Sequence, residues 1–204
     1  KGQSLSNAFF WAISRSQDAT FVHDWFSKAG QQMGGEYRYV VNGGSQGNAR
    51  VSFLDEKAVE TATGTTTSSR RSYQITGGMT QGISSRIRAR ANADYVSDLA
   101  PDQLYQQDVY RATRSTRSFG GNVTGSWTQF VLSGTLDRTD VFYPDGTYTT
   151  YGGLPRVNFN RAERRLGRSL FYFGAGGEYA TLLRSSVRDD ITIQDQGLTR
   201  LDFT

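Results

Sequence analysis

The sequence contains no cysteine and a single histidine, His23, which together exclude several kinds of catalytic and metal site. Without cysteine these residues offer no thiolate ligand, no cysteine nucleophile and no disulfide. No second histidine can join His23 in a metal site, and no Ser/His/Asp set is supported. We expect no enzyme activity, no cofactor and no metal. We interpret His23 as a strand residue that faces a lumen or an interface.

Long hydrophobic runs are also missing. Charged or polar residues interrupt every apolar run, and none approaches the roughly 20 residues that a membrane-spanning helix needs. Hydrophobic residues make up only 36% of the 204 residues, whereas aromatic residues make up 13% and there are 23 glycines. The aromatic content argues against disorder. Such a composition is typical of a barrel whose strands keep one face apolar and the other polar.

The sequence also lacks a signal peptide and an initiator methionine, since it starts at Lys1. We interpret it as a processed product or a fragment. The formal net charge of +4 is modest. It indicates ordinary surface charge, and we expect no nucleic-acid partner.

Polar and apolar residues alternate with a period of two along much of the chain. The clearest case runs from Ser84 to Tyr95. Successive strand side chains point to opposite faces, so this segment has one polar and one apolar surface. The polar surface would carry Arg86, Arg88, Arg90, Asn92 and Asp94, and the apolar one Ile87, Ala89, Ala91, Ala93 and Tyr95.

The same period predicts about ten strands, with another beginning near Leu198. Their ranges are 7–14, 18–28, 33–42, 47–56, 70–80, 83–97, 115–126, 130–142, 153–161 and 168–184. Short connections near 15–17, 43–46, 81–82, 127–129 and 162–167 alternate with longer ones near 57–69, 98–114, 143–152 and 185–197. In an antiparallel meander, this places the longer connections at one end, as in outer-membrane barrels. We predict an all-β, antiparallel, up-and-down transmembrane β-barrel segment of about 10–11 strands, part of a larger barrel.

The arginine row Arg86, Arg88 and Arg90 has two interpretations. On the lumen side, it could hold phosphate or carboxylate groups of a passing ligand. Alternatively, the arginines pair with lumen acids such as Glu36 and Asp94 and brace the barrel. Arg38 belongs to the same predicted set of lumen-facing polar residues. Aromatic residues would form an interfacial girdle, with Trp11, Trp25, Tyr37 and Trp127 as the candidates.

A series of local motifs resembles the early barrel of the LptD family of lipopolysaccharide-assembly proteins. The motifs occur in family order along nearly the whole chain. They are Phe9-Phe10-Trp11-Ala12-Ile13, Asp18-Ala19-Thr20, Gly34-Gly35-Glu36-Tyr37-Arg38-Tyr39, Ser69-Arg70-Arg71, Ala93-Asp94-Tyr95-Val96-Ser97-Asp98 with Tyr105 and Asp108, Gly153-Leu154-Pro155-Arg156-Val157, and Leu198-Thr199-Arg200-Leu201-Asp202.

The resemblance implies a large barrel that transports lipopolysaccharide into the outer leaflet of the bacterial outer membrane through a lateral gate. Residues 1–204 would form one partial barrel domain, without the family's periplasmic jelly roll and later strands. The implied partners are lipopolysaccharide, an LptE-type plug lipoprotein and periplasmic Lpt bridge proteins. The implied gate strands carry Phe9, Phe10, Trp11, Ile13, Phe21, His23 and Trp25.

Two features depart from the family pattern. The family commonly has a proline in each gate strand, where this sequence has Ala8 and His23. A first strand rising from the periplasm would also put the longer connections on the periplasmic side, against the usual loop-length rule. Two other functions stay open: a general outer-membrane porin, and a soluble β-sandwich binding module. The apolar faces, rich in alanine and glycine, are thin for a sandwich core.

Overall fold

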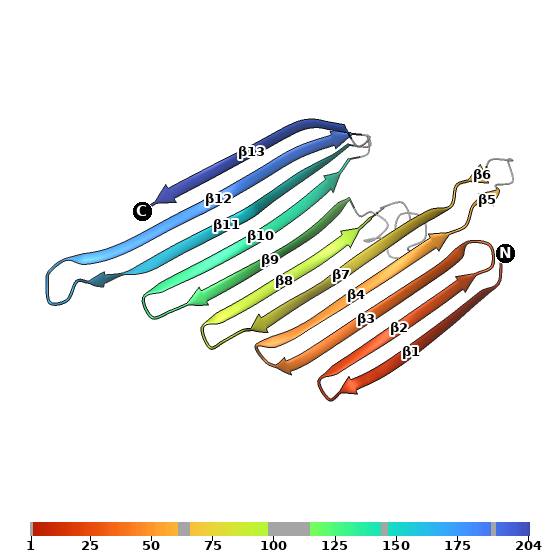
Figure 1. Ribbon diagram of the computed structural model, residues 1–204, viewed down its shortest axis with the longest axis horizontal. Helices are drawn as coiled ribbons and strands as arrows, with labels where there is room; N and C mark the ends of the chain where they lie inside the picture. The colour runs from red at the N-terminus through yellow and green to blue at the C-terminus, as the bar shows by residue number, and fades with distance from the viewer. Residues whose placement is uncertain (1, 61–65, 98–114, 144–146, 189–190) are drawn as a thin grey trace. The chain divides into compact units, whose positions relative to one another are not determined.

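The computed structural model describes residues 2–60, 66–97, 115–143, 147–188 and 191–204. Every element in these ranges is a β-strand. Eleven strands pair in sequence order into one antiparallel sheet, and β5 and β6 form a separate hairpin (Figure 1). The strands are β1 (Ser4–Ser14), β2 (Gln17–Phe26), β3 (Gly30–Asn42), β4 (Ser45–Glu56), β5 (Val59–Glu60), β6 (Thr66–Thr67), β7 (Arg70–Gly82), β8 (Ile87–Val96), β9 (Thr116–Ser126), β10 (Phe130–Phe142), β11 (Thr147–Arg165), β12 (Tyr172–Arg188) and β13 (Ile191–Phe203).

The strand order confirms the predicted up-and-down topology, because each long strand pairs with the next long strand along the chain. By its internal contacts the chain divides into two compact units. The first consists of Lys1–Gly78 and Ala93–Arg114, and the second of Met79–Asn92 and Ser115–Thr204. The two units are described separately below.

In the first unit, the strand register separates an apolar face from a polar one. Phe9 lies opposite Phe21, and Ala19 lies opposite both Trp11 and Tyr37 on the neighbouring strands. Because side chains alternate along each strand, these residues share one face. The opposite face carries the cross-strand ion pairs Arg38–Asp18 (2.9 Å) and Arg50–Glu36 (2.7 Å).

The second unit has the same division. Across β9 and β10, Val123 lies opposite Gly134 and Gly121 opposite Leu136, which defines an apolar face. That face continues on β10 to Leu132 and Phe130 and on β11 to Phe159 and Val157. The opposite, polar face pairs Thr124 with Ser133 and Asn122 with Thr135.

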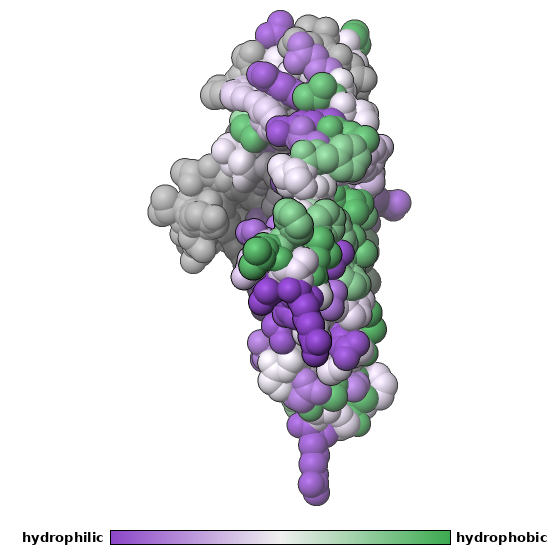
Figure 2. Space-filling model, turned by 90° about the vertical axis from the view of Figure 1, so that its left-hand side faces the viewer, coloured by the Kyte–Doolittle hydropathy of each residue, from purple (hydrophilic) through white to green (hydrophobic). Residues whose placement is uncertain are grey.

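The apolar faces are exposed rather than packed into a core. The buried hydrophobic residues among those described are only Ala19, Val96, Ala180 and Val187, and none of the large side chains is fully buried. Figure 2 shows hydrophobic side chains exposed at the surface. A β-sandwich would bury one face of each sheet against a second layer. The exposed faces therefore fit a segment whose apolar side meets lipid.

No helix in the described ranges is long and apolar enough to cross a membrane.

Several predicted boundaries were wrong, although all eleven long strands were predicted. The expected connections at 143–152 and 185–197 lie largely within β11, β12 and β13, because their Thr- and Gln-rich residues continue the cross-strand pairing. Residues 84–86 form a bend, so β8 begins at Ile87 rather than at 83. In the predicted loop at 57–69, the structure has β5 and β6. Residues 61–65, 98–114, 144–146 and 189–190, with the motif residues Tyr105 and Asp108, lie outside the described ranges.

Candidate functional site

An arginine-lined groove lies on the polar face of the second unit. It has a volume of about 380 Å³ and lies between the start of β8 and the facing part of β9. Two arginines of β8, Arg88 and Arg90, contribute to it, together with Arg86 in the bend that precedes the strand. The remaining lining residues are Gly82, Ser84, Ser85, Ile87, Asn122, Thr124 and Ser126.

Backbone and side-chain hydrogen bonds hold the polar wall of this groove in place. The Ser126 amide donates to the Arg86 carbonyl over 2.8 Å, which fixes β9 beside the bend. The Asn122 amide group donates to the Thr135 hydroxyl over 2.8 Å, and the Thr124 hydroxyl donates to Asn122 Oδ1 over 2.8 Å. One part of the groove lining therefore consists of amide and hydroxyl groups held by hydrogen bonds, and another part consists of the three guanidinium groups.

The three groove arginines are exposed, and none of them forms an ion pair or side-chain hydrogen bond with the residues that the structure describes. Glu36, one of the acids expected to brace them, pairs instead with Arg50. Guanidinium groups form planar, two-pronged hydrogen bonds that match phosphate and carboxylate groups. The row is thus chemically suited to bind an anionic group that approaches from the open side.

The remaining predicted lumen residues lie where the alternation places them. In β8, Asn92 and Asp94 are exposed and alternate with half-buried neighbours. In the first unit, Glu36 and Arg38 share the polar face, each in an ion pair with a residue of a neighbouring strand.

The two predicted gate strands, β1 and β2, are regularly paired. Their register runs without a break from Ser4 opposite Phe26 to Ala12 opposite Asp18. Ala8 and His23, which the resemblance places at the family's proline positions, lie within this regular stretch. The β1–β2 pair is therefore not loosened at these positions. The opposite edge of β1 has no partner strand among the described residues, because β1 is the first strand of the sheet.

The predicted gate side chains divide between the two faces of the first unit. Phe10 lies opposite Thr20 on the polar face, and Ile13 lies at the irregularity between Ala12 and Ser14. The imidazole Nε2 of His23 lies 3.4 Å from Gln31 Oε1. The other gate residues share the apolar face with His23, namely Phe9, Trp11, Phe21 and Trp25.

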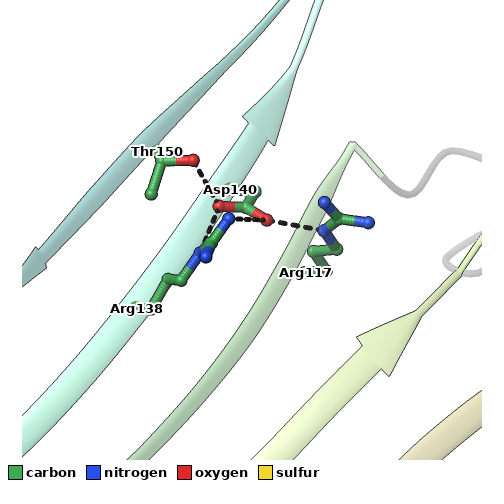
Figure 3. A network of polar contacts seen from close by, with 4 residues as sticks. All are labelled: Arg117, Arg138, Asp140 and Thr150. Carbon is green, nitrogen blue, oxygen red and sulfur yellow. Dashed lines mark hydrogen bonds and ion pairs between the residues drawn. The ribbon is translucent and has the colours of Figure 1, made fainter. Parts of the chain in front are cut away.

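A buried carboxylate, Asp140, forms a polar cluster that the sequence analysis missed (Figure 3). Its side chain is only 3% exposed. It accepts hydrogen bonds from Arg117 Nε of β9 (2.6 Å), Arg138 Nε of its own strand (3.0 Å) and the Thr150 hydroxyl of β11 (2.6 Å). The Arg117 guanidinium also lies over the rings of Phe142 and Tyr148, at 5.0 Å and 5.7 Å from their centroids.

This cluster, which we call the Asp140 cluster (Arg117, Arg138, Asp140 and Thr150), lies on the apolar face. The unbroken β9–β10 register puts Asp140 on the same side as Leu136 and Phe130. Ten residues separate Phe130 from Asp140, about 33 Å along a strand. With a tilt of about 45°, this corresponds to roughly 23 Å, close to the height of the apolar band of a transmembrane barrel.

The described residues contain no group of three or more histidine, cysteine, aspartate or glutamate side chains that could hold a metal ion.

Comparison with known proteins adds evidence that the geometry alone does not give. No family model matches the chain. Curated relatives include the LPS-assembly protein LptD of Cupriavidus necator, 27% identical over 158 residues, and that of Aromatoleum aromaticum, 29% identical over 181 residues. The LPS-assembly protein LptD of Cupriavidus pinatubonensis is 27% identical over 158 residues. The alignments cover 77%, 87% and 77% of this chain.

The chain is related to LptD. The likeness supports the resemblance found in the motifs, and the all-β meander agrees with it. The aligned region corresponds to only 18–21% of the length of these LptD proteins. The chain therefore matches only about a fifth of each relative, and the likeness does not cover the rest of those proteins.

Proposed function

We propose that this chain forms the early strands of an outer-membrane barrel that transports lipopolysaccharide to the outer leaflet. Its lipid-facing side is the exposed apolar face, and its lumen side is the polar face with the arginine groove. An LptE-type plug lipoprotein and periplasmic Lpt bridge proteins are the proposed partners, through parts of the barrel and domains beyond these strands. The relatedness to LPS-assembly proteins and the two-faced sheet support this proposal.

The observation that carries the proposal is the row of exposed guanidinium groups of Arg86, Arg88 and Arg90, which has no acidic partner among the described residues. A lumen that passes an amphipathic lipid must offer partners to its anionic head while its acyl chains stay in an apolar environment. Phosphate groups are the anions that bidentate arginines bind best. In this mechanism the groove holds the head briefly as the lipid moves toward the gate strands.

The test uses the full-length protein and replaces two groove arginines, Arg88→Gln with Arg90→Gln. A charge-assisted hydrogen bond contributes about 1.5–3 kcal/mol, so we expect at least about a tenfold slower delivery of lipopolysaccharide to the outer leaflet. The matched control, Arg156→Gln with Arg184→Gln, removes two charges from the polar face of β11 and β12, away from the groove. An equal loss of lipopolysaccharide delivery in both variants would show a general charge effect and contradict the proposed role of the groove.

The porin alternative predicts different results for the same protein and the same groove variant. A passive channel would conduct ions through the purified barrel, and lipopolysaccharide delivery would not depend on Arg88 and Arg90. Unchanged delivery by the groove variant, together with steady ion conductance without any plug lipoprotein, would overturn the transport proposal.

A lateral gate at β1 is the second part of the proposal. Because the β1–β2 pairing is regular, the gate would open at the other edge of β1, against a strand outside this sequence. A photo-crosslinking residue at Phe9, on the apolar face of β1, should form adducts with lipopolysaccharide during transport. The control position is Val123, on the apolar face of β9. Adducts at Val123 without adducts at Phe9 would exclude a gate at β1.

A further inference from the structure

The tip of the β11–β12 hairpin carries an unusual combination of charge and apolar exposure. Four arginines occur between residues 161 and 168, with one acid, Glu163, among them. Directly after them, Leu170 is 87% exposed and Phe171 is 74% exposed. The arginines are Arg161, Arg164, Arg165 and Arg168. We call residues 161–173 the hairpin tip.

The hairpin tip extends beyond its neighbour β10. The last hydrogen bonds from β11 toward β10 reach the turn that precedes β10. The Ala162 amide donates to the Gln129 carbonyl, and the Arg164 guanidinium donates to the Thr128 carbonyl over 2.9 Å. Beyond them, β11 and β12 pair only with each other, through Arg164 opposite Phe173 and Arg165 opposite Tyr172. Figure 1 shows this hairpin reaching farther than the turn between β9 and β10.

The turn itself is ordered by its own hydrogen bonds. Arg165 donates to the carbonyls of Ser169 and Arg168. The Ser169 hydroxyl donates to the Leu166 carbonyl over 2.7 Å, and Gly167 takes the positive φ of 59° that the turn requires. The exposed leucine and phenylalanine are therefore presented on a formed turn rather than on a loose loop.

Two of the four arginines, Arg161 and Arg168, have guanidinium groups without a hydrogen-bond or ion-pair partner among the described residues. Arg168 makes no side-chain hydrogen bond or ion pair with the described residues. The guanidinium of Arg161 lies 5.0 Å from the ring centroid of Phe173, and its Nε is buried without a partner. Leu170 and Phe171 are exposed beside these groups. Exposed apolar side chains that are rimmed by polar groups mark interaction sites.

The hairpin tip lies at one margin of the apolar band of the second unit. Arg161 is opposite Phe130, which is ten residues along β10 from the Asp140 cluster at the other margin. If that band spans the hydrocarbon core, the hairpin tip lies at the level of lipid headgroups. Arginine beside exposed aromatic and aliphatic side chains is the composition of segments that bind anionic membrane interfaces.

We propose that the hairpin tip is a docking site for anionic, phosphate-bearing lipid headgroups. Leu170 and Phe171 enter the boundary between headgroups and acyl chains, and the guanidinium groups of Arg161 and Arg168 bind the phosphate. The net positive charge of the tip selects an anionic partner over a neutral one. The site concerns lipids that surround the protein, so it does not depend on the proposed transport of lipopolysaccharide.

The test places the full-length protein in nanodiscs of phosphatidylcholine alone, or with phosphatidylglycerol as the anionic probe. Hydrogen exchange of the amides of residues 166–171 should slow when phosphatidylglycerol is present. Native mass spectrometry should show retained phosphatidylglycerol molecules. In Arg161→Gln with Arg168→Gln, retention should fall on the order of tenfold or more, because each arginine near an anionic surface contributes about a fivefold factor.

Controls separate this site from charge and folding effects. Arg156→Gln with Arg184→Gln removes the same amount of charge from the polar face of β11 and β12, away from the hairpin tip, and should retain the lipid. Arg168→Gln alone removes an exposed side chain that makes no hydrogen bond or ion pair with the described residues, so it should leave the fold intact and still weaken retention. Leu170→Ser with Phe171→Ser should abolish the slowed exchange while keeping every charge.

Three results would overturn the proposal. One is equal exchange at residues 166–171 in the two nanodisc types. Another is equal lipid loss in the control variant Arg156→Gln with Arg184→Gln. The third is protection that appears only when a partner protein is added, which would make the hairpin tip a protein-docking surface instead.

Discussion

Arg117 and Asp140 face each other across β9 and β10, with Arg117 Nε 2.6 Å from a carboxylate oxygen, on the apolar face of the sheet. Two polar side chains on this face remain compatible with lipid contact because each satisfies the other. Arg138 and Thr150 occupy the other carboxylate oxygen, and aromatic rings lie against the Arg117 guanidinium. The pair thereby ends the apolar band with a satisfied charge cluster.

Replacing the carboxylate should destabilise the protein strongly. In Asp140→Asn, Arg117 and Arg138 lose their shared anion while they stay partly buried. Breaking a buried ion pair from one side costs about 3 kcal/mol or more. We expect a loss of this size in the free energy of unfolding, measured by urea titration of the full-length protein in detergent.

The control for this prediction is Glu36→Gln, which breaks the more exposed pair with Arg50 in the first unit. Exposed ion pairs contribute about 1 kcal/mol or less, so its loss should be small. Similar losses in both variants would mean that Asp140 is not the buried, shared anion described above.

Two glycines of the second unit should respond in opposite ways to a methyl group. A Cβ on Gly152 would lie 2.5 Å from the Asp137 carbonyl oxygen, whereas a Cβ on Gly134 would meet nothing within 4 Å. Gly152→Ala should cost about 1–3 kcal/mol, because the backbone of β10 must move. Gly134→Ala should be neutral or stabilise by about 0.5 kcal/mol. Unfolding titrations of the two variants compare these directly, and a reversed order would contradict the β10–β11 packing.

A charge placed on each face of β10 tests which face meets lipid. Leu136→Arg puts a guanidinium near the middle of the apolar band, where it should cost about 2–4 kcal/mol. Ser133→Arg puts the same group on the polar face and should change stability little. Folding efficiency into lipid bilayers, read from heat-modifiable gel mobility, compares the two. If Ser133→Arg were the more damaging variant, the assignment of faces would be inverted.

The long strands and the face assignments were predictable because they depend on a local property. Arg88, Arg90 and Asn92 alternate with Ala89 and Ala91, and that pattern alone fixes which residues share a face. The groove beside them also requires that β8 pairs with β9. An up-and-down topology predicts this pairing, because consecutive strands are neighbours. The period-two pattern was therefore sufficient for the arginine side of the site.

The Asp140 cluster depends on information that the alternation does not carry. Arg117 and Asp140 are 23 residues apart, and their meeting requires the exact register of β9 against β10. Arg117 and Asp140 also occupy apolar-face positions, so in the sequence they interrupt the alternation and give no sign that they pair with each other. A search for opposite charges at matching distances from the intervening turn would have found this pair.

The ends of β11, β12 and β13 were missed for a related reason. Thr149 and Thr150 have no apolar alternation to identify them, yet they pair with Ser186 and Ser185. Their strand conformation follows from the partner strand rather than from their own side chains. The local pattern cannot report an extension that is imposed by a neighbour.

The outer edge of β1 has a consequence for how these strands reach the membrane. Hydrocarbon offers no hydrogen-bond partner to an unpaired backbone amide or carbonyl, and each such group costs several kcal/mol there. A strand with one bare edge is therefore insoluble in the bilayer interior, however apolar its side chains are. If these strands span the bilayer as proposed, the outer edge of β1 must acquire a partner strand before or during insertion.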